Sequence, residues 1–282
     1  MTRNFRFQFA VLLSLLSLSN TRAAEPAKND APVKASLIAD ISNIRAGRPF
    51  TIGVLLEIEP GWHVYWTNPG DSGAPTVVKF TAPEGFVVTP DPFPIPHAFR
   101  QGKETAYGYD RGVVLTARVT PPMDIRIGAP VKFEASVNWL SCKEACIPGK
   151  ASLSLEMKVK DHTGPASVDD FRRYGSIVSP ISARPADIGS VQTKMDAVKH
   201  VETVTVHWKN PVNSIQLFPG ADEGVTVSQI SVKKTENDST DITLKIETAA
   251  DQKPASDRLG VLIAWRDAEG HMLGWETTVP IK

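Results

Sequence analysis

Residues 137–150 read VNWLSCKEACIPGK, and this stretch holds both cysteines of the chain, four positions apart. The alternating apolar run Val131 to Leu140 leads into the first cysteine and is typical of a β-strand. A second alternating run, Ala151 to Val159, follows Pro148-Gly149, which we expect to turn the chain. The sequence therefore predicts a cysteine pair on a turn between two strands, a place where proteins commonly put chemistry.

The spacing of Cys142 and Cys146 permits three interpretations: a redox pair, a structural clip or part of a metal site. A disulfide closing so short a loop stabilises the fold by only about 2 kcal/mol, so its structural value is small. Short loops also tend to hold the bond in strained geometry, and strained or exposed disulfides are the easily reduced ones. Lys143 favours a thiolate and Glu144 opposes it, so the local charge leaves reactivity open. The spacing favours the redox pair.

The composition describes an ordinary globular protein. The 282 residues are 41% hydrophobic and 22% charged, which is enough material for two domains. Because 31 basic residues balance 31 acidic ones, the chain has no electrostatic footprint for nucleic acid or an anionic membrane surface.

Residues 1–23 resemble a secretory signal peptide. Arg3 and Arg6 form a positive region, Phe7 to Leu18 is apolar, and Thr21-Arg22-Ala23 offers small residues at a cleavage site. No later apolar run approaches the roughly 18 residues that a membrane-spanning helix needs. We therefore expect a mature chain that is not inserted in a membrane and works in the periplasm, where disulfides persist.

The rest of the chain predicts an all-β protein with two antiparallel sandwiches in tandem. After a flexible tail, 24–32, a cysteine-bearing domain is expected over 33–160, a linker over 161–191 and a second β-sandwich over 192–282. Short runs rich in Val, Ile, Thr and aromatic residues, separated by Gly, Pro and Asn, occupy 33–39, 50–58, 64–66, 77–80, 86–89, 113–119, 131–140 and 151–159, then 201–208, 214–218, 225–232, 242–246, 261–265 and 272–279.

The Pro-rich passage from Thr89 to Gly102 is expected to be one long loop, because proline cannot donate to a β-ladder. Long loops inside compact domains are usually lids or binding loops, with an edge-covering connection as the alternative.

Other motifs have ordinary interpretations. Residues 69–75, PGDSGAP, look like the nucleophile segment of chymotrypsin-type proteases, but too little chain precedes them to carry the other catalytic residues, so we expect a turn. His63 or His97 could join the cysteines around Cu(I) or zinc, although the spacing lacks the second cluster of a zinc site. The remaining aromatic and histidine candidates are expected in the core or on the surface: Trp62, Trp66, Trp139, His200, His207 and His271.

Taken together, three segments resemble the amino-terminal periplasmic domain of the DsbD-type thiol:disulfide interchange proteins, including the ScsB relatives linked to copper tolerance. These segments are 61–73, GWHVYWTNPGDSG; 99–109, FRQGKETAYGY; and 139–148, WLSCKEACIP. The resemblance covers about residues 33 to 160, and the later half follows only the general layout of the ScsB-like members.

The resemblance implies immunoglobulin-like sandwiches and a protein-disulfide reductase that needs no cofactor and no metal. Cys146 would exchange with the partner and Cys142 would resolve the mixed disulfide. Phe99 would be the cap residue over the sulfurs. The cleft beside them would hold His63, Tyr65 and Tyr109.

The implied partners are a separate membrane electron-donor protein and periplasmic thioredoxin-like or disulfide-bearing proteins. The donor is expected to be separate because the family's membrane segment and thioredoxin-like domain are absent here. The better-studied members also have a longer cysteine spacing and acidic residues where this chain has His97 and Ala98. The alternatives are a non-catalytic envelope binding module with a structural disulfide and a Cu(I)-binding protein.

Overall fold

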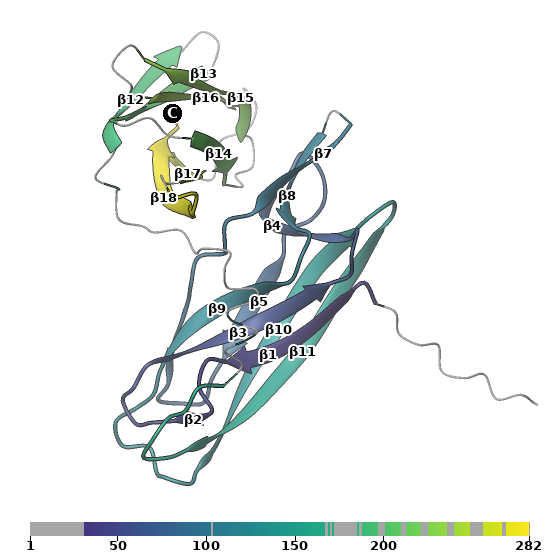
Figure 1. Ribbon diagram of the computed structural model, residues 1–282, viewed down its shortest axis with the longest axis vertical. Helices are drawn as coiled ribbons and strands as arrows, with labels where there is room; N and C mark the ends of the chain where they lie inside the picture. Colours follow the sequence, from purple (N-terminus) through teal and green to yellow (C-terminus); the bar gives the residue numbers. More distant parts are fainter. Residues whose placement is uncertain are drawn as a thin grey trace, which may run out of the picture. The chain divides into compact units, whose positions relative to one another are not determined.

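The computed structural model describes residues 31–102, 104–166, 169, 171, 185, 188–196, 201–209, 213–220, 225–235, 240–248, 256–266 and 269–281 (Figure 1). The expected signal peptide, nearly all of the expected tail and most of the expected linker lie outside these residues, as does His200.

The first eleven strands form a β-sandwich, which can be followed in purple to teal in Figure 1. One sheet has the order β1-β3-β9-β6, and the other has the order β2-β11-β10-β4-β8-β7, with β5 also beside β10. The pairings are antiparallel apart from the short parallel pair β2 with β11. The bounds are β1 Val33–Ala39, β2 Asn43–Ile44, β3 Phe50–Ile58, β4 His63–Gly70, β5 Val77–Thr81, β6 Val87–Pro90, β7 His97–Gln101, β8 Glu104–Tyr109, β9 Val113–Thr120, β10 Pro130–Cys142 and β11 Cys146–Val159.

The alternation along β10 shows how the sequence builds this sandwich. Val131, Phe133, Ala135, Val137 and Trp139 are buried, and the residues between them are exposed. Successive side chains of a strand point to opposite faces, so these five form one row toward the facing sheet. Burying an aliphatic or aromatic side chain stabilises the fold by about 1.5–3 kcal/mol, so the row holds the two sheets together.

The strands β12 to β18 form a second sandwich, with sheets β12-β13-β16-β15 and β14-β17-β18. Its core includes Trp208, Leu244 and Ile263. The bounds are β12 Ile188–Asp196, β13 Val201–Trp208, β14 Asn213–Pro219, β15 Val225–Lys234, β16 Thr240–Thr248, β17 Arg258–Arg266 and β18 Met272–Pro280. The prediction of an all-β protein with two antiparallel sandwiches is confirmed, and β12 begins three residues before the expected end of the linker.

Several strands contain residues that we expected in turns or loops: Pro69 and Gly70 end β4, and Thr89 and Pro90 end β6. Pro148-Gly149 lies inside β11, opposite Leu140 and Trp139, and does not turn the chain. Proline is tolerated there because β2 pairs with β11 only at Lys158 and Val159, which leaves this end of β11 at a sheet edge. Likewise, His97–Gln101 is the edge strand β7, so the passage from Thr89 to Gly102 is not one continuous loop.

Gly149 offers a test of this packing. A Cβ atom on Gly149 would lie 2.2 Å from Cε2 of the Trp139 indole, which covers the glycine from the neighbouring strand. We expect Gly149→Ala to destabilise the protein by about 1–3 kcal/mol, the usual cost of overpacking, in urea unfolding. Gly260→Ala is the control, because a Cβ there meets nothing within 4 Å; equal effects of the two variants would contradict the contact.

Candidate functional site

The two cysteines form a disulfide at the end of a β-hairpin. Cys142 is the last residue of β10, Cys146 is the first residue of β11, and the two are directly paired with Cα atoms 4.1 Å apart. The turn between them is Lys143 to Ala145, closed by a 3.2 Å hydrogen bond from the Lys143 N–H to the Ala145 carbonyl. The two sulfurs are therefore held together by the strand register and not by distant packing.

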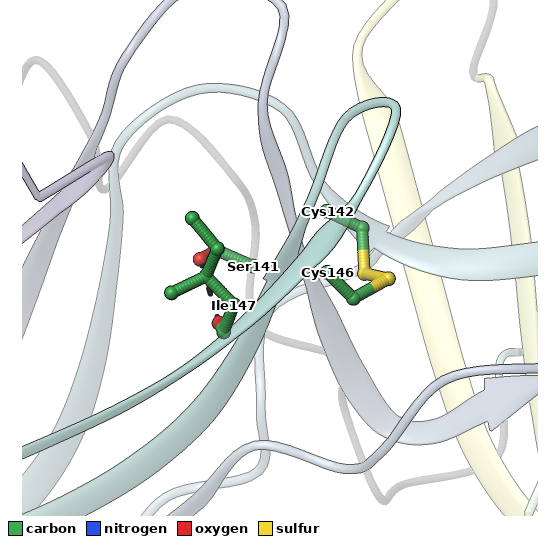
Figure 2. Close-up of a disulfide and its surroundings, with 4 residues drawn as sticks. All are labelled: Ser141, Cys142, Cys146 and Ile147. Atoms are coloured by element: carbon green, nitrogen blue, oxygen red, sulfur yellow. Dashed lines mark hydrogen bonds between the residues drawn. A yellow bond between two sulfur atoms is a disulfide. The ribbon is translucent and has the colours of Figure 1, made fainter.

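The disulfide lies on one face of the hairpin, and the neighbouring side chains Ser141 and Ile147 lie on the other, as Figure 2 shows. The Ser141 hydroxyl donates a 3.0 Å hydrogen bond to the Ile147 carbonyl, which ties the two strands beside the cysteines. This alternation places the sulfurs on the face of the sheet opposite to the core row of β10.

The two cysteines differ in exposure. Cys142 is only 2% exposed, whereas Cys146 is exposed together with the whole hairpin turn. Ile147, which follows Cys146, is also 45% exposed although it is a large aliphatic residue. An incoming protein therefore meets Cys146 first, and Cys142 lies behind it.

Strand β4 brings two rings to the disulfide. It pairs with the end of β10 so that His63 lies opposite Cys142, and directly opposite residues of an antiparallel pair share a face. Tyr65, two residues on, has the same orientation. His63 and Tyr65 are 7% and 2% exposed, and their rings meet edge to face with centroids 5.1 Å apart.

Phe99 on the edge strand β7 covers these groups. Its ring stacks on His63 with centroids 5.1 Å apart and an interplanar angle of 26°. It also packs, with Leu140, against a small cluster of Tyr65, Ala106 and Cys142 that is separate from the sandwich core. The structure thus brings Phe99, His63, Tyr65 and the cysteine pair together on the outer face of one sheet.

Tyr109 occupies a different place. It is buried in the core of the sandwich, and its hydroxyl donates a 2.6 Å hydrogen bond to the Pro94 carbonyl. Burial raises the pKa of Tyr109 well above its usual value. Its role is therefore to anchor the passage that leads into β7, away from the sulfurs.

The segment after β4 supports Tyr65 from below. A Cβ on Gly73 would lie 2.4 Å from two atoms of the Tyr65 ring, so only glycine fits beneath it. The Thr76 hydroxyl donates to the Tyr65 carbonyl at 2.6 Å, and an Asp71 carboxylate oxygen accepts the Thr105 N–H at 2.7 Å. Residues 69–75 were expected to form a turn; Pro69 and Gly70 instead end β4, and the bend that follows holds Gly73 against Tyr65.

Burial decides the protonation of the two rings. It lowers the pKa of His63 below its usual value, while the Asp110 carboxylate acts in the opposite direction with a smaller effect. Burial also raises the pKa of Tyr65, and Glu104 adds to this. Around neutral pH both rings are therefore uncharged, and the charges near them are carried by exposed residues such as Glu104, Asp110 and those of the hairpin turn.

The other candidates fall elsewhere. Trp66 and Trp139 belong to the sandwich core, as expected. His207 pairs with Asp241, with Nδ1 and Oδ1 2.8 Å apart, a partner that the sequence did not reveal. In the described part of the chain, no three His, Cys, Asp or Glu side chains converge as metal ligands would.

Comparisons with known proteins point to one family. Residues 31–158 match the family model for the N-terminal part of the thiol:disulfide interchange protein DsbD. No curated protein matches the chain.

Among solved structures, the N-terminal periplasmic domain of ScsB from Proteus mirabilis is similar to this chain, with a TM-score of 0.61 and 15% sequence identity, covering 92% of this chain and 97% of that one. This likeness supports the fold of both sandwiches as immunoglobulin-like. The YadV chaperone has a TM-score of only 0.22 at 8% identity, covering 86% of this chain and 100% of that one.

Removal of the Phe99 ring should uncover Cys142. In a Cys146→Ser background, we expect Phe99→Ala to speed alkylation of the Cys142 thiol by iodoacetamide about tenfold, the effect of lowering the barrier by about 1.4 kcal/mol. Val87→Ala, at a residue that is 61% exposed on β6, is the control. An alkylation rate unchanged by Phe99→Ala would show that the ring does not shield the thiol.

Proposed function

We propose that this chain passes electrons from a reduced Cys142/Cys146 pair to oxidised partner proteins by thiol-disulfide exchange; the match of residues 31–158 to the DsbD N-terminal family model supports this. It acts in this proposal as a protein-disulfide reductase. The unequal exposure of the two cysteines carries the proposal, since disulfide exchange needs one accessible sulfur and one protected sulfur close by.

The chemistry follows from the two positions. The thiolate of Cys146 attacks a sulfur of the partner's disulfide, which forms a mixed disulfide and releases one partner thiolate. The thiolate of Cys142 then attacks the Cys146 sulfur; the Cys142–Cys146 bond forms, the bond to the partner breaks, and the second partner thiolate leaves. Two electrons and, after protonation of the leaving thiolates, two protons have then passed to the partner.

The hairpin suits this exchange because it does not need to unfold. Cys142 and Cys146 are held as a directly paired couple, while β10 is joined to β4 and β5 on its other side. The register keeps the sulfurs adjacent whether or not they are bonded. A disulfide that closes so short a loop adds only about 2 kcal/mol to the free energy of unfolding, so the protein stays folded when the disulfide is reduced.

The proposed location is the periplasm. Residues 1–23 have the pattern of a cleaved signal peptide, and the similar ScsB domain is described as periplasmic. Among the described residues there is no helix long and apolar enough to cross a membrane. The proposed partners are a separate membrane electron donor and thioredoxin-like or disulfide-bearing proteins, with 33–160 as the redox domain and 161–191 linking it to 192–282.

Single cysteine variants separate the two roles. Cys142→Ser keeps the exposed Cys146 and should form long-lived mixed disulfides with envelope proteins, because no second thiol releases them. Cys146→Ser keeps only the buried thiol, and we expect its capture to be at least about tenfold weaker and its electron transfer to stop. The measurement is non-reducing electrophoresis with mass spectrometry of the attached proteins. Equal capture by both variants, or unchanged transfer by Cys146→Ser, would refute the roles.

The reduction potential distinguishes exchange from a structural disulfide. We expect reversible reduction in a dithiothreitol or glutathione series, with a potential above about −300 mV, because inert structural bonds have lower values. The control is the Cys142→Ser, Cys146→Ser double variant, which should give no transition. A potential well below about −300 mV would favour a binding module with a structural clip.

A further inference from the structure

His63 is the titratable side chain that lies directly across from the protected cysteine. It faces Cys142 in the β4–β10 register, and it is enclosed by Phe99 on one side and by Tyr65 at its edge. Its Nε2 atom is buried and has no hydrogen-bond partner among the described residues. A buried polar atom without a partner lowers stability, so this position has a cost that packing alone does not explain.

The resolving step of the exchange needs a base at this place. A free cysteine thiol has a pKa of about 8.5, and apolar surroundings raise it. Cys142 lies among apolar groups and is 2% exposed, so a neighbouring group has to take the proton of its thiol before the sulfur can attack. Water has little access to a thiol covered in this way.

We propose that His63 is the general base that takes the proton of the Cys142 thiol in the resolving step, an assignment that rests on the exchange function proposed above. The proton passes from the Cys142 sulfur to the imidazole, the resulting thiolate attacks the Cys146 sulfur, and the bond from Cys146 to the partner breaks. The departing partner thiolate takes up the proton, directly or through solvent, and His63 returns to its neutral form.

The charges around His63 suit a base that works near neutral pH. Burial lowers its pKa, so the ring is neutral and able to accept a proton, and the Asp110 carboxylate favours the imidazolium that then forms. Tyr65 and Phe99 enclose the ring without adding charge. Other charged or titratable groups on the surrounding elements include His97 and Arg100 on β7, Glu104 and Tyr107 on β8, and Lys143 and Glu144 at the hairpin turn.

A single-turnover experiment with oxidised glutathione tests the assignment. The reduced mature chain is mixed with the probe at pH 5 to 9, quenched with acid, and the glutathione adduct on Cys146 is followed by mass spectrometry. In the wild type, we expect the adduct to decay with a rate that levels off above a midpoint below 6.5, the usual pKa of histidine.

In His63→Gln, we expect decay at pH 7 to be slower by about a hundredfold, the lower end of general-base effects. Its rate should rise about tenfold per pH unit up to the pKa of the thiol itself. His162→Gln, at an exposed histidine that pairs with Asp161 outside the site, is the matched control and should follow the wild type.

The outcomes separate the two proposals. Decay of the adduct in His63→Gln with the wild-type rate and pH profile overturns the role of His63 and leaves the exchange function intact. Absence of any adduct or oxidation in the wild type overturns both. If His63→Gln does not fold, NMR titration of the wild-type imidazole decides: a midpoint that differs between the oxidised and reduced forms supports the contact with the thiol, and identical midpoints overturn it.

Discussion

The antiparallel register of β10 and β11 is the constraint on which the site depends. It pairs Cys142 with Cys146 across a three-residue turn and continues along both strands as far as Pro130 and Lys158. Because side chains alternate along a strand, the same register that sends Phe133 and Val137 into the core sends Cys142 to the other face. A slip of one residue would exchange these faces, so the core that stabilises the sandwich also places the sulfurs.

The residues around the disulfide therefore lie apart from the core residues that stabilise the fold. The core lies between the two sheets, whereas Cys142, Tyr65 and Ala106 form a small cluster on the outer face of one sheet, capped by Phe99. The hairpin of β7 and β8 that carries Phe99 is attached to the sheet on one side only, where β8 pairs with β4. Phe99 therefore covers the sulfurs from the sheet edge, while Tyr109 at the end of β8 holds the hairpin to the core.

The comparisons with known proteins cover the two sandwiches to different extents. The family match covers the sandwich that carries the cysteines, and the likeness to the ScsB domain extends over both sandwiches. Residues of the two sandwiches meet through both rings and a hydrogen bond: Phe218 of β14 meets Trp66 and Tyr107 edge to face, and the Asn68 amide donates to the Pro219 carbonyl at 2.7 Å. Since Trp66 follows Tyr65 on β4, the second sandwich packs against the strand that carries the site.

The sequence by itself determined the parts of this protein that depend on local pattern. Alternation predicts most strands of both sandwiches, although β2, β7, β8 and β12 were not among the predicted runs. The short spacing of Cys142 and Cys146 lets the two residues reach each other. The likeness of three short segments to a known family also pointed to Phe99, His63 and Tyr65. The prediction of the fold class succeeds because strand periodicity and short loops are properties of neighbouring residues.

The family resemblance pointed to Cys146 as the exchanging cysteine, but only the tertiary structure shows that it is the exposed one, because exposure depends on the cap and on β4, which come from distant parts of the chain. The sequence also could not predict that Pro148 lies within a strand. Proline is allowed there only because that stretch of β11 lies at a sheet edge. The position of Tyr109 in the core, and of His63 across from Cys142, follows from which strands lie side by side. Pairing between distant strands depends on the whole chain and cannot be predicted from any one segment.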